Sequence, residues 1–136
     1  RFGFQPLFEK QACHIIQPDL CHCGGIWEAK KIAAVAEVHY MGVAPHNPLG
    51  PVANAVTLHF ALSTPNFLIQ ECNVDLHSSF IREVLPNLPV LEDGYLKLPE
   101  GPGLGIELNE EAAAKYQYKP YDRPVIIHQD GSVGLE

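Results

Sequence analysis

Short apolar runs alternate with helical patterns along the first half of the chain. Residues 14–17, 41–44 and 66–71 are short runs of mostly apolar side chains, each followed or ended by polar or turn-forming residues. Between them, residues 26–40 repeat apolar side chains at helical spacing, and residues 52–62 are apolar almost all round. Strands and helices that alternate with short connections predict a parallel sheet with right-handed helical crossovers.

The second half loses this alternation. Residues 86–105 are rich in Pro and Gly, which predicts an ordered but irregular backbone. Asn109 is a suitable N-cap for a short helix. Further on, Asp130 and Gly131 favour a tight turn between two short strands.

Composition and charge exclude several kinds of partner. The 136 residues are 46% hydrophobic and 18% charged, as in an ordinary globular protein with a core of its own. The net charge is −7 and the basic residues are scattered. A nucleic-acid partner needs a basic face, and a membrane helix needs about 20 apolar residues in a row. We therefore expect neither nucleic acid nor a membrane as a partner.

The four cysteines raise the question of a metal site. Cys21 and Cys23 flank His22, but structural zinc sites use wider gaps and a second pair of ligands at a fixed distance. The spacing therefore argues against zinc. Reduced thiols in a cytoplasmic protein explain these residues better.

Three side chains with catalytic chemistry stand at the ends of the apolar runs: Asp19, His46 and Glu71. Ligands of parallel α/β proteins bind at the carboxyl ends of strands, so we expect all three on one rim. Neighbouring strands lie about 4.8 Å apart, which lets Asp19 accept a hydrogen bond from the Nδ1–H of His46 and leaves Nε2 available as a base. Glu71 would accept a hydrogen bond or, if protonated, donate one to an oxyanion. Taken singly, each also fits an ordinary turn or loop role.

Four motifs in a fixed order carry a family resemblance. They are Gln17-Pro18-Asp19-Leu20 followed by His22 and Gly24-Gly25-Ile26, Ala44-Pro45-His46-Asn47-Pro48-Leu49-Gly50-Pro51, Asn66-Phe67-Leu68-Ile69-Gln70-Glu71 and Pro102-Gly103-Leu104-Gly105-Ile106-Glu107. They resemble the last three strand motifs and the C-terminal signature of galactonate-dehydratase-like members of the mandelate racemase subgroup, in the enolase superfamily. The resemblance implies an α/β fold, the C-terminal part of a (β/α)₈ (TIM-type) barrel with an irregular C-terminal tail. Residues 1–85 would supply the last strand–helix units, and residues 86–136 a tail packed on the barrel or capping domain.

The same resemblance implies an activity, the Mg²⁺-dependent dehydration of a sugar acid to a 2-keto-3-deoxy acid. His46 would be the acid/base, Asp19 its dyad partner, and Glu71 the group that binds the substrate carboxylate as it becomes an enediolate. The Mg²⁺ ligands come from earlier strands in this family, so we expect none in this chain. The resemblance also implies a homo-oligomer for the full-length form.

Several alternatives stay open. His22 and His77 follow strand ends and are either substrate-binding or ordinary loop histidines. A racemase or epimerase would use the same dyad with a different base opposite it, and a catalytically silent half-barrel would serve as a binding or assembly module. The near-continuously apolar strands suit burial on both faces. We therefore expect the 136 residues alone to leave an apolar face uncovered and to be inactive.

Overall fold

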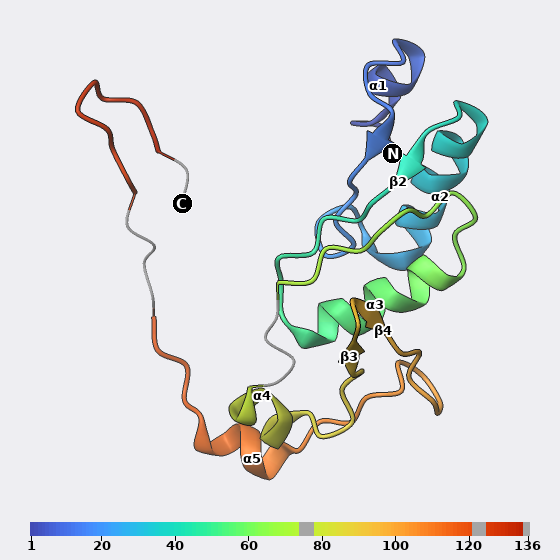
Figure 1. The fold of residues 1–136 in the computed structure, drawn as a ribbon. Coiled ribbons are helices and arrows are strands. Elements are labelled where there is room, and N and C mark those ends of the chain that lie inside the picture. The colour runs from blue at the N-terminus through green and yellow to red at the C-terminus, as the bar shows by residue number, and fades with distance from the viewer. Residues whose placement is uncertain (74–77, 121–124, 135–136) are drawn as a thin grey trace.

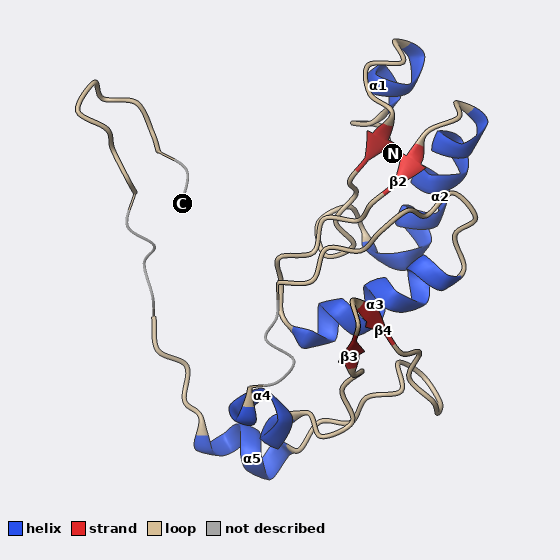
Figure 2. Cartoon of the chain, viewed as in Figure 1, coloured by secondary structure: helices blue, strands red, loops and turns tan. Residues whose placement is uncertain are grey.

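The computed structural model describes residues 1–73, 78–120 and 125–134 (Figure 1). Two short parallel strands, β1 (Ile15–Ile16) and β2 (Gly42–Val43), pair with Ile15 opposite Gly42 and Ile16 opposite Val43. A single parallel bridge from Val43 to Phe67 adds the third apolar run to β2. The predicted parallel order is therefore present. The strands are shorter than the apolar runs, and most of the chain is helix or loop (Figure 2).

Two helices follow the two strands. The helix α2 (Gly25–Val38) follows β1 and packs on β2, and α3 (Pro51–Leu62) follows β2 and packs on α2. Gly24 and Gly25 have φ angles of 110° and 83°, so the sharp turn into α2 uses backbone conformations that favour glycine. Pro51 occupies the first turn of α3, where its missing N–H costs no hydrogen bond. Both helices thus begin where the sequence pattern places them.

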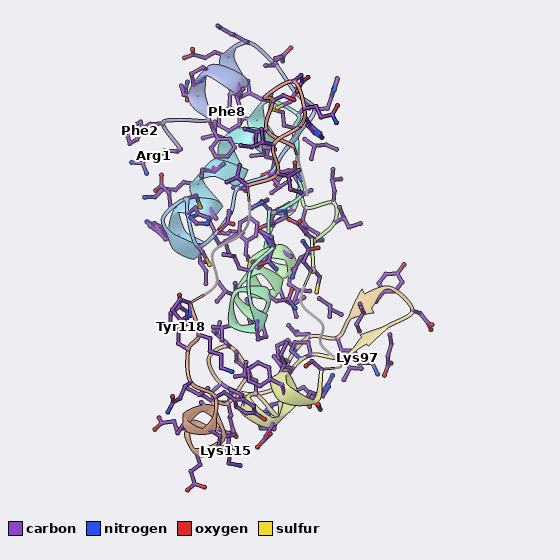
Figure 3. All side chains as sticks on the ribbon, turned by 90° about the vertical axis from the view of Figure 1, so that its left-hand side faces the viewer. Arg1, Phe2, Phe8, Lys97, Lys115 and Tyr118 are labelled. Carbon is purple, nitrogen blue, oxygen red and sulfur yellow. The ribbon has the colours of Figure 1, made fainter. Side chains whose placement is uncertain are left out.

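The core lies between the strands and α2, and a short N-terminal helix closes it. The helix α1 (Gln5–Glu9) contributes Phe8, which is 1% exposed and stacks on His39 with ring centroids 5.7 Å apart. Figure 3 shows the Phe8 side chain at the end of the molecule opposite Lys115. The buried apolar cluster consists of Phe8, Ile16, Leu20, Ala29, Ile32, Ala33, Ala36, Met41, Val43 and Phe60.

Apolar side chains of the runs are left partly uncovered, as expected. Ile15, Leu68 and Ile69 are 49%, 57% and 68% exposed. Gly42 lets the third run approach β2 closely, because a Cβ there would lie 2.4 Å from a methyl carbon of Leu68. The runs therefore carry exposed apolar side chains, of which Leu68 and Ile69 line a pocket together with Leu58 and Leu62 of α3.

The second half contains a hairpin that was not predicted from the sequence. The strands β3 (Leu91–Glu92) and β4 (Tyr95–Leu96) pair antiparallel inside the stretch predicted to be irregular, so that prediction is wrong for these residues. Asp93 and Gly94 both have positive φ, 50° and 81°. Two such residues form the hairpin turn that an Asp-Gly pair favours, so the signal was present in the sequence.

A short helix within the tail packs on a short helix that precedes the tail. The helices α4 (Ser79–Val84) and α5 (Glu110–Lys115) pack together at the opposite end of the molecule from α1 (Figure 1). Tyr116 donates a hydrogen bond to Glu83 at 2.6 Å across this pair. His59 on α3 bonds through Nε2 to the carbonyl oxygen of Leu104 at 3.1 Å, which ties the tail to the first half. The boundary after residue 85 stays a prediction.

The end of the described chain is a small turn. A single antiparallel bridge joins Ile127 to Val133 around the predicted Asp130–Gly131 turn, and this segment stands clear of the rest in Figure 1. Among the described residues, no helix is long and apolar enough to cross a membrane.

The predicted cap of α5 can be tested directly. The side-chain oxygen of Asn109 accepts a hydrogen bond from the Ala112 amide at 3.0 Å. Asn109→Ala should weaken this helix end by about 1 kcal/mol and speed hydrogen exchange across α5, while Asn109→Asp should retain protection. Exchange measured by mass spectrometry checks this. Equal exchange in all three proteins would show that the cap contributes nothing.

Candidate active site

Asp19 is fixed by the turn in which it lies. It follows β1 and the fully buried Pro18. One carboxylate oxygen, Oδ1, accepts hydrogen bonds from the backbone amides of Cys21 at 2.7 Å and His22 at 3.2 Å. The Asp19 carbonyl accepts from the Cys23 amide at 2.7 Å. These local bonds set the carboxylate orientation and leave Oδ2 directed to another partner.

That partner is His46, at the end of β2. Its Nδ1 lies 2.8 Å from Asp19 Oδ2, so the predicted hydrogen bond between the two side chains is present. Asp19 is 9% exposed, whereas the His46 side chain is 48% exposed. The carboxylate is thus enclosed. With Nδ1 donating to it, the Nε2 of His46 is left as an unprotonated acceptor on a solvent-accessible ring.

The carboxyl group of Asp19 stays ionised despite its burial. Burial raises its pKa, but the hydrogen bond from His46, the Cys21 amide and the nearby His22 together outweigh burial and hold the pKa below its usual value. An ionised carboxylate accepts hydrogen bonds and cannot donate one. It therefore selects the tautomer of His46 that carries its proton on Nδ1.

Glu71 is held beside the segment that carries His46. Its Oε2 accepts a hydrogen bond from the backbone amide of Asn47 at 2.7 Å, and its Oε1 accepts from the side chain of Asn73 at 3.3 Å. The bond to Asn47 brings the ends of the second and third runs together, as a shared rim requires. The catalytic role of Glu71 stays a prediction.

Three buried or partly buried amides next to this site were not predicted from the sequence. Asn47 and Asn54 are 2% and 0% exposed, and Asn47 Nδ2 donates to Asn54 Oδ1 at 3.2 Å. Gln70 also donates to Asn54, through its side-chain amide. The polar Asn54 inside a mostly apolar helix was the available signal, because a buried amide needs hydrogen-bond partners.

The two remaining candidate histidines differ in what the structure describes. His22 Nε2 lies 3.8 Å from Asp19 Oδ2, too far for a hydrogen bond, and its side chain is 73% exposed. It therefore lies beside the dyad without forming part of it. His77 lies outside the described residues.

Metal ligands are a separate matter. Among residues 1–73, 78–120 and 125–134, no group of three or more His, Cys, Asp or Glu side chains is arranged to hold a metal ion. The described residues therefore provide no Mg²⁺ site of their own.

Comparison with known proteins identifies the family. Residues 1–112 match the family described as enolase C-terminal domain-like. The chain belongs to the enolase superfamily, in its mandelate racemase/muconate lactonizing enzyme branch. This agrees with the resemblance carried by the four sequence motifs.

Individual relatives narrow the class of protein to which this chain is related. The D-galactonate dehydratase of Ralstonia pickettii (strain 12J) is 39% identical over 140 residues, which cover 98% of this chain and 37% of that protein. The structure of an enolase from Pantoea ananatis with bound D-gluconate and Mg is 36% identical with a TM-score of 0.78, over 85% of this chain and 28% of the other. A mandelate racemase/muconate lactonizing enzyme-like protein from Roseovarius sp. TM1035 is 37% identical with a TM-score of 0.78, over 100% and 31%.

These proteins show what the chain is related to and how much of them it spans. It is homologous to sugar-acid dehydratases of the enolase superfamily. The chain spans a little over a third of the length of the curated relatives it matches. Its fold matches the C-terminal portion of enolase-superfamily structures.

The ionised state of Asp19 predicts a pH dependence of stability. Because its pKa is lower in the folded protein than the value of about 3.9 in an unfolded chain, the unfolded state binds the proton more readily. The stabilisation from Asp19 is then present above about pH 4 and lost as the pH falls through the folded pKa. Asp19→Asn should lower the free energy of unfolding by about 1–2 kcal/mol at pH 7, and the difference should shrink at pH 3. Urea unfolding of both proteins at several pH values measures this. A difference that stays constant with pH would contradict it.

Proposed function

We propose that this chain supplies the general acid/base of a Mg²⁺-dependent sugar-acid dehydratase, as the C-terminal part of a (β/α)₈ barrel. The observation that carries the proposal is the 2.8 Å bond between His46 Nδ1 and Asp19 Oδ2. It prepares Nε2 of His46 to take a proton, and the homology to sugar-acid dehydratases gives the class of substrate. Residues 1–85 form the barrel units in this proposal, and residues 86–136 form a tail that packs on them.

In the proposed reaction His46 Nε2 removes the proton on the carbon next to the substrate carboxylate. The electrons of that C–H bond move into the carboxylate and form an enediolate. They then return to expel the hydroxyl group on the next carbon, which leaves as water after it receives a proton from the second catalytic residue, which we assign to the part of the enzyme outside this chain. The resulting enol becomes a 2-keto-3-deoxy acid. Asp19 keeps Nδ1 protonated and stabilises the imidazolium formed during the transfer.

We assign substrate-binding roles in this reaction to Glu71 and His22. The bonds from Asn47 and Asn73 fix the Glu71 side chain at the edge where His46 lies, and we assign it to the substrate carboxylate. His22 is exposed beside Asp19 and is a candidate contact to a substrate hydroxyl. Bound Mg²⁺ would stabilise negative charge on the substrate carboxylate. No described cluster fits this ion, so we assign its ligands, with the second catalytic residue, to the part of the enzyme outside this chain.

A racemase or epimerase is the second candidate function. It uses the same Asp19–His46 pair to remove or return the proton and differs in the fate of the enediolate. A dehydratase releases water, whereas a racemase returns a proton to the opposite face. Analysis of the products of D-galactonate and D-gluconate distinguishes the two. A third candidate, a catalytically silent assembly module, predicts no change in either substrate.

The dyad can be tested by removing each member in the full-length enzyme. Asn at position 19 would place an N–H group against His46 Nδ1 and favour the other tautomer. Asp19→Asn and His46→Ala should therefore slow exchange of the substrate α-proton by about 10²–10⁴-fold. Mg²⁺ binding, measured by calorimetry, should be unchanged because neither residue is assigned as a ligand.

A matched histidine variant controls for non-specific effects. His128 lies on the small turn that stands clear of the rest of the chain, so His128→Ala should keep the normal rate of exchange (Figure 1). Loss of Mg²⁺ binding in His46→Ala, or full exchange activity in that variant, would contradict the assignment of His46 as the base.

A further inference from the structure

Asn47 makes contacts in two directions from a buried position directly after His46. Its backbone N–H donates to the Glu71 carboxylate at 2.7 Å. Its side-chain Nδ2 donates both to the Glu71 carbonyl oxygen at 3.2 Å and to Asn54 Oδ1 at 3.2 Å. At 2% exposed, the side chain is shielded from water that would compete for these bonds. One residue therefore contacts both the backbone and the carboxylate of Glu71.

The side chain of Asn47 belongs to a chain of three amides whose direction is fixed. The carbonyl oxygen of Glu71 can only accept, so the Asn47 amide must present its N–H₂ there. Its second N–H then requires the oxygen of Asn54, and Gln70 must in turn donate to Asn54. Rotating any one amide by 180° would place two oxygens or two donors together. The network thus has a single arrangement.

Hydrogen bonds restrain the chain both at the residue before Glu71 and at the Glu71 carbonyl. Gln70, the residue before it, is bonded to Asn54 on α3, and the Glu71 carbonyl is bonded to Asn47. The helix α3 also begins just after the His46–Asn47 segment. Asn54 therefore serves as a common anchor for the ends of the second and third apolar runs.

The network leaves two buried polar atoms unsatisfied. Asn54 Nδ2 and Gln70 Oε1 find no partner within the described residues. An apolar residue at position 54 would remove this orphaned donor, but it would also remove the acceptor of the Asn47 and Gln70 side-chain amides, so the arrangement depends on all three amides together. Its distinctive consequence is a fixed position for the Glu71 carboxylate relative to His46.

We propose that Asn47 is a positioning residue that sets Glu71 against His46 for proton abstraction, with Asn54 and Gln70 as its supports. This inference rests on the proposed function, in which Glu71 binds the substrate carboxylate as charge develops on it. Displacing Glu71 would weaken a contact that strengthens in the transition state. The loss therefore falls on kcat more than on KM.

A double-mutant cycle in the full-length Mg²⁺-loaded enzyme tests the proposal, with dehydration of D-galactonate and D-gluconate and α-proton exchange as readouts. Asn47→Ala keeps the backbone N–H but removes the side-chain bonds, and it should lower kcat about 10–100-fold with little change in KM. In the Glu71→Gln background, where the carboxylate is already lost, the same change should lower the exchange rate by less than about twofold. Equal losses in the two backgrounds would overturn the positioning role.

Two further variants keep the outcome interpretable. Asn109→Ala, which removes an Asn hydrogen bond at the distant α5, should leave kcat unchanged and controls for a general loss of stability. If Asn47→Ala does not fold, Gln70→Met removes one donor to Asn54 and should show a smaller kcat loss that is also absent in the Glu71→Gln background. Failure of the proposed function looks different, because the unmutated full-length enzyme would then dehydrate neither sugar acid. Full turnover in Glu71→Gln would instead overturn the role of Glu71 on which the positioning by Asn47 rests.

Discussion

The hydrogen bond between Asp19 and His46 is the interaction on which the site depends. It needs a carboxylate that is enclosed yet ionised, and the turn after β1 provides this by directing two backbone amides to one carboxylate oxygen. The other oxygen then meets the imidazole from the next strand. Because β1 and β2 pair in parallel, the two residues that follow them emerge at the same edge. The pairing of the strands therefore sets the distance between Asp19 and His46, while the turn orients the carboxylate and helps to keep it ionised.

The amide network extends this arrangement to the third run. The bonds that join Asn47, Asn54 and Gln70 cross from the His46 segment to α3 and back to the residue before Glu71. Three successive strand ends are thus connected by polar contacts above an apolar core. Ile15 and Leu68 in the apolar runs are exposed, as they would be if further chain packed on them in the proposed barrel.

The sequence predicted the parts that depend on local pattern. Apolar runs, Gly24–Gly25, Pro51 and Asn109 each specify a strand, turn or helix end by local sterics or capping, and the structure confirms them. The Asp19–His46 bond was also predicted, because parallel strands bring their ends together. The orientation of Asn47 could not be predicted, since it depends on the positions of α3 and the third run. The β3–β4 hairpin was missed because the many Pro and Gly residues around it obscured the Asp93–Gly94 turn.

The central claim is that Asp19 holds His46 in the tautomer with Nδ1 protonated and Nε2 available as a base. Nitrogen-15 NMR of the protein labelled at histidine measures this directly, because protonated and unprotonated ring nitrogens have very different chemical shifts. We expect neutral His46 to carry its proton on Nδ1 in the native protein and to lose this preference in Asp19→Ala. A neutral His46 with its proton on Nε2 in the native protein would contradict the account.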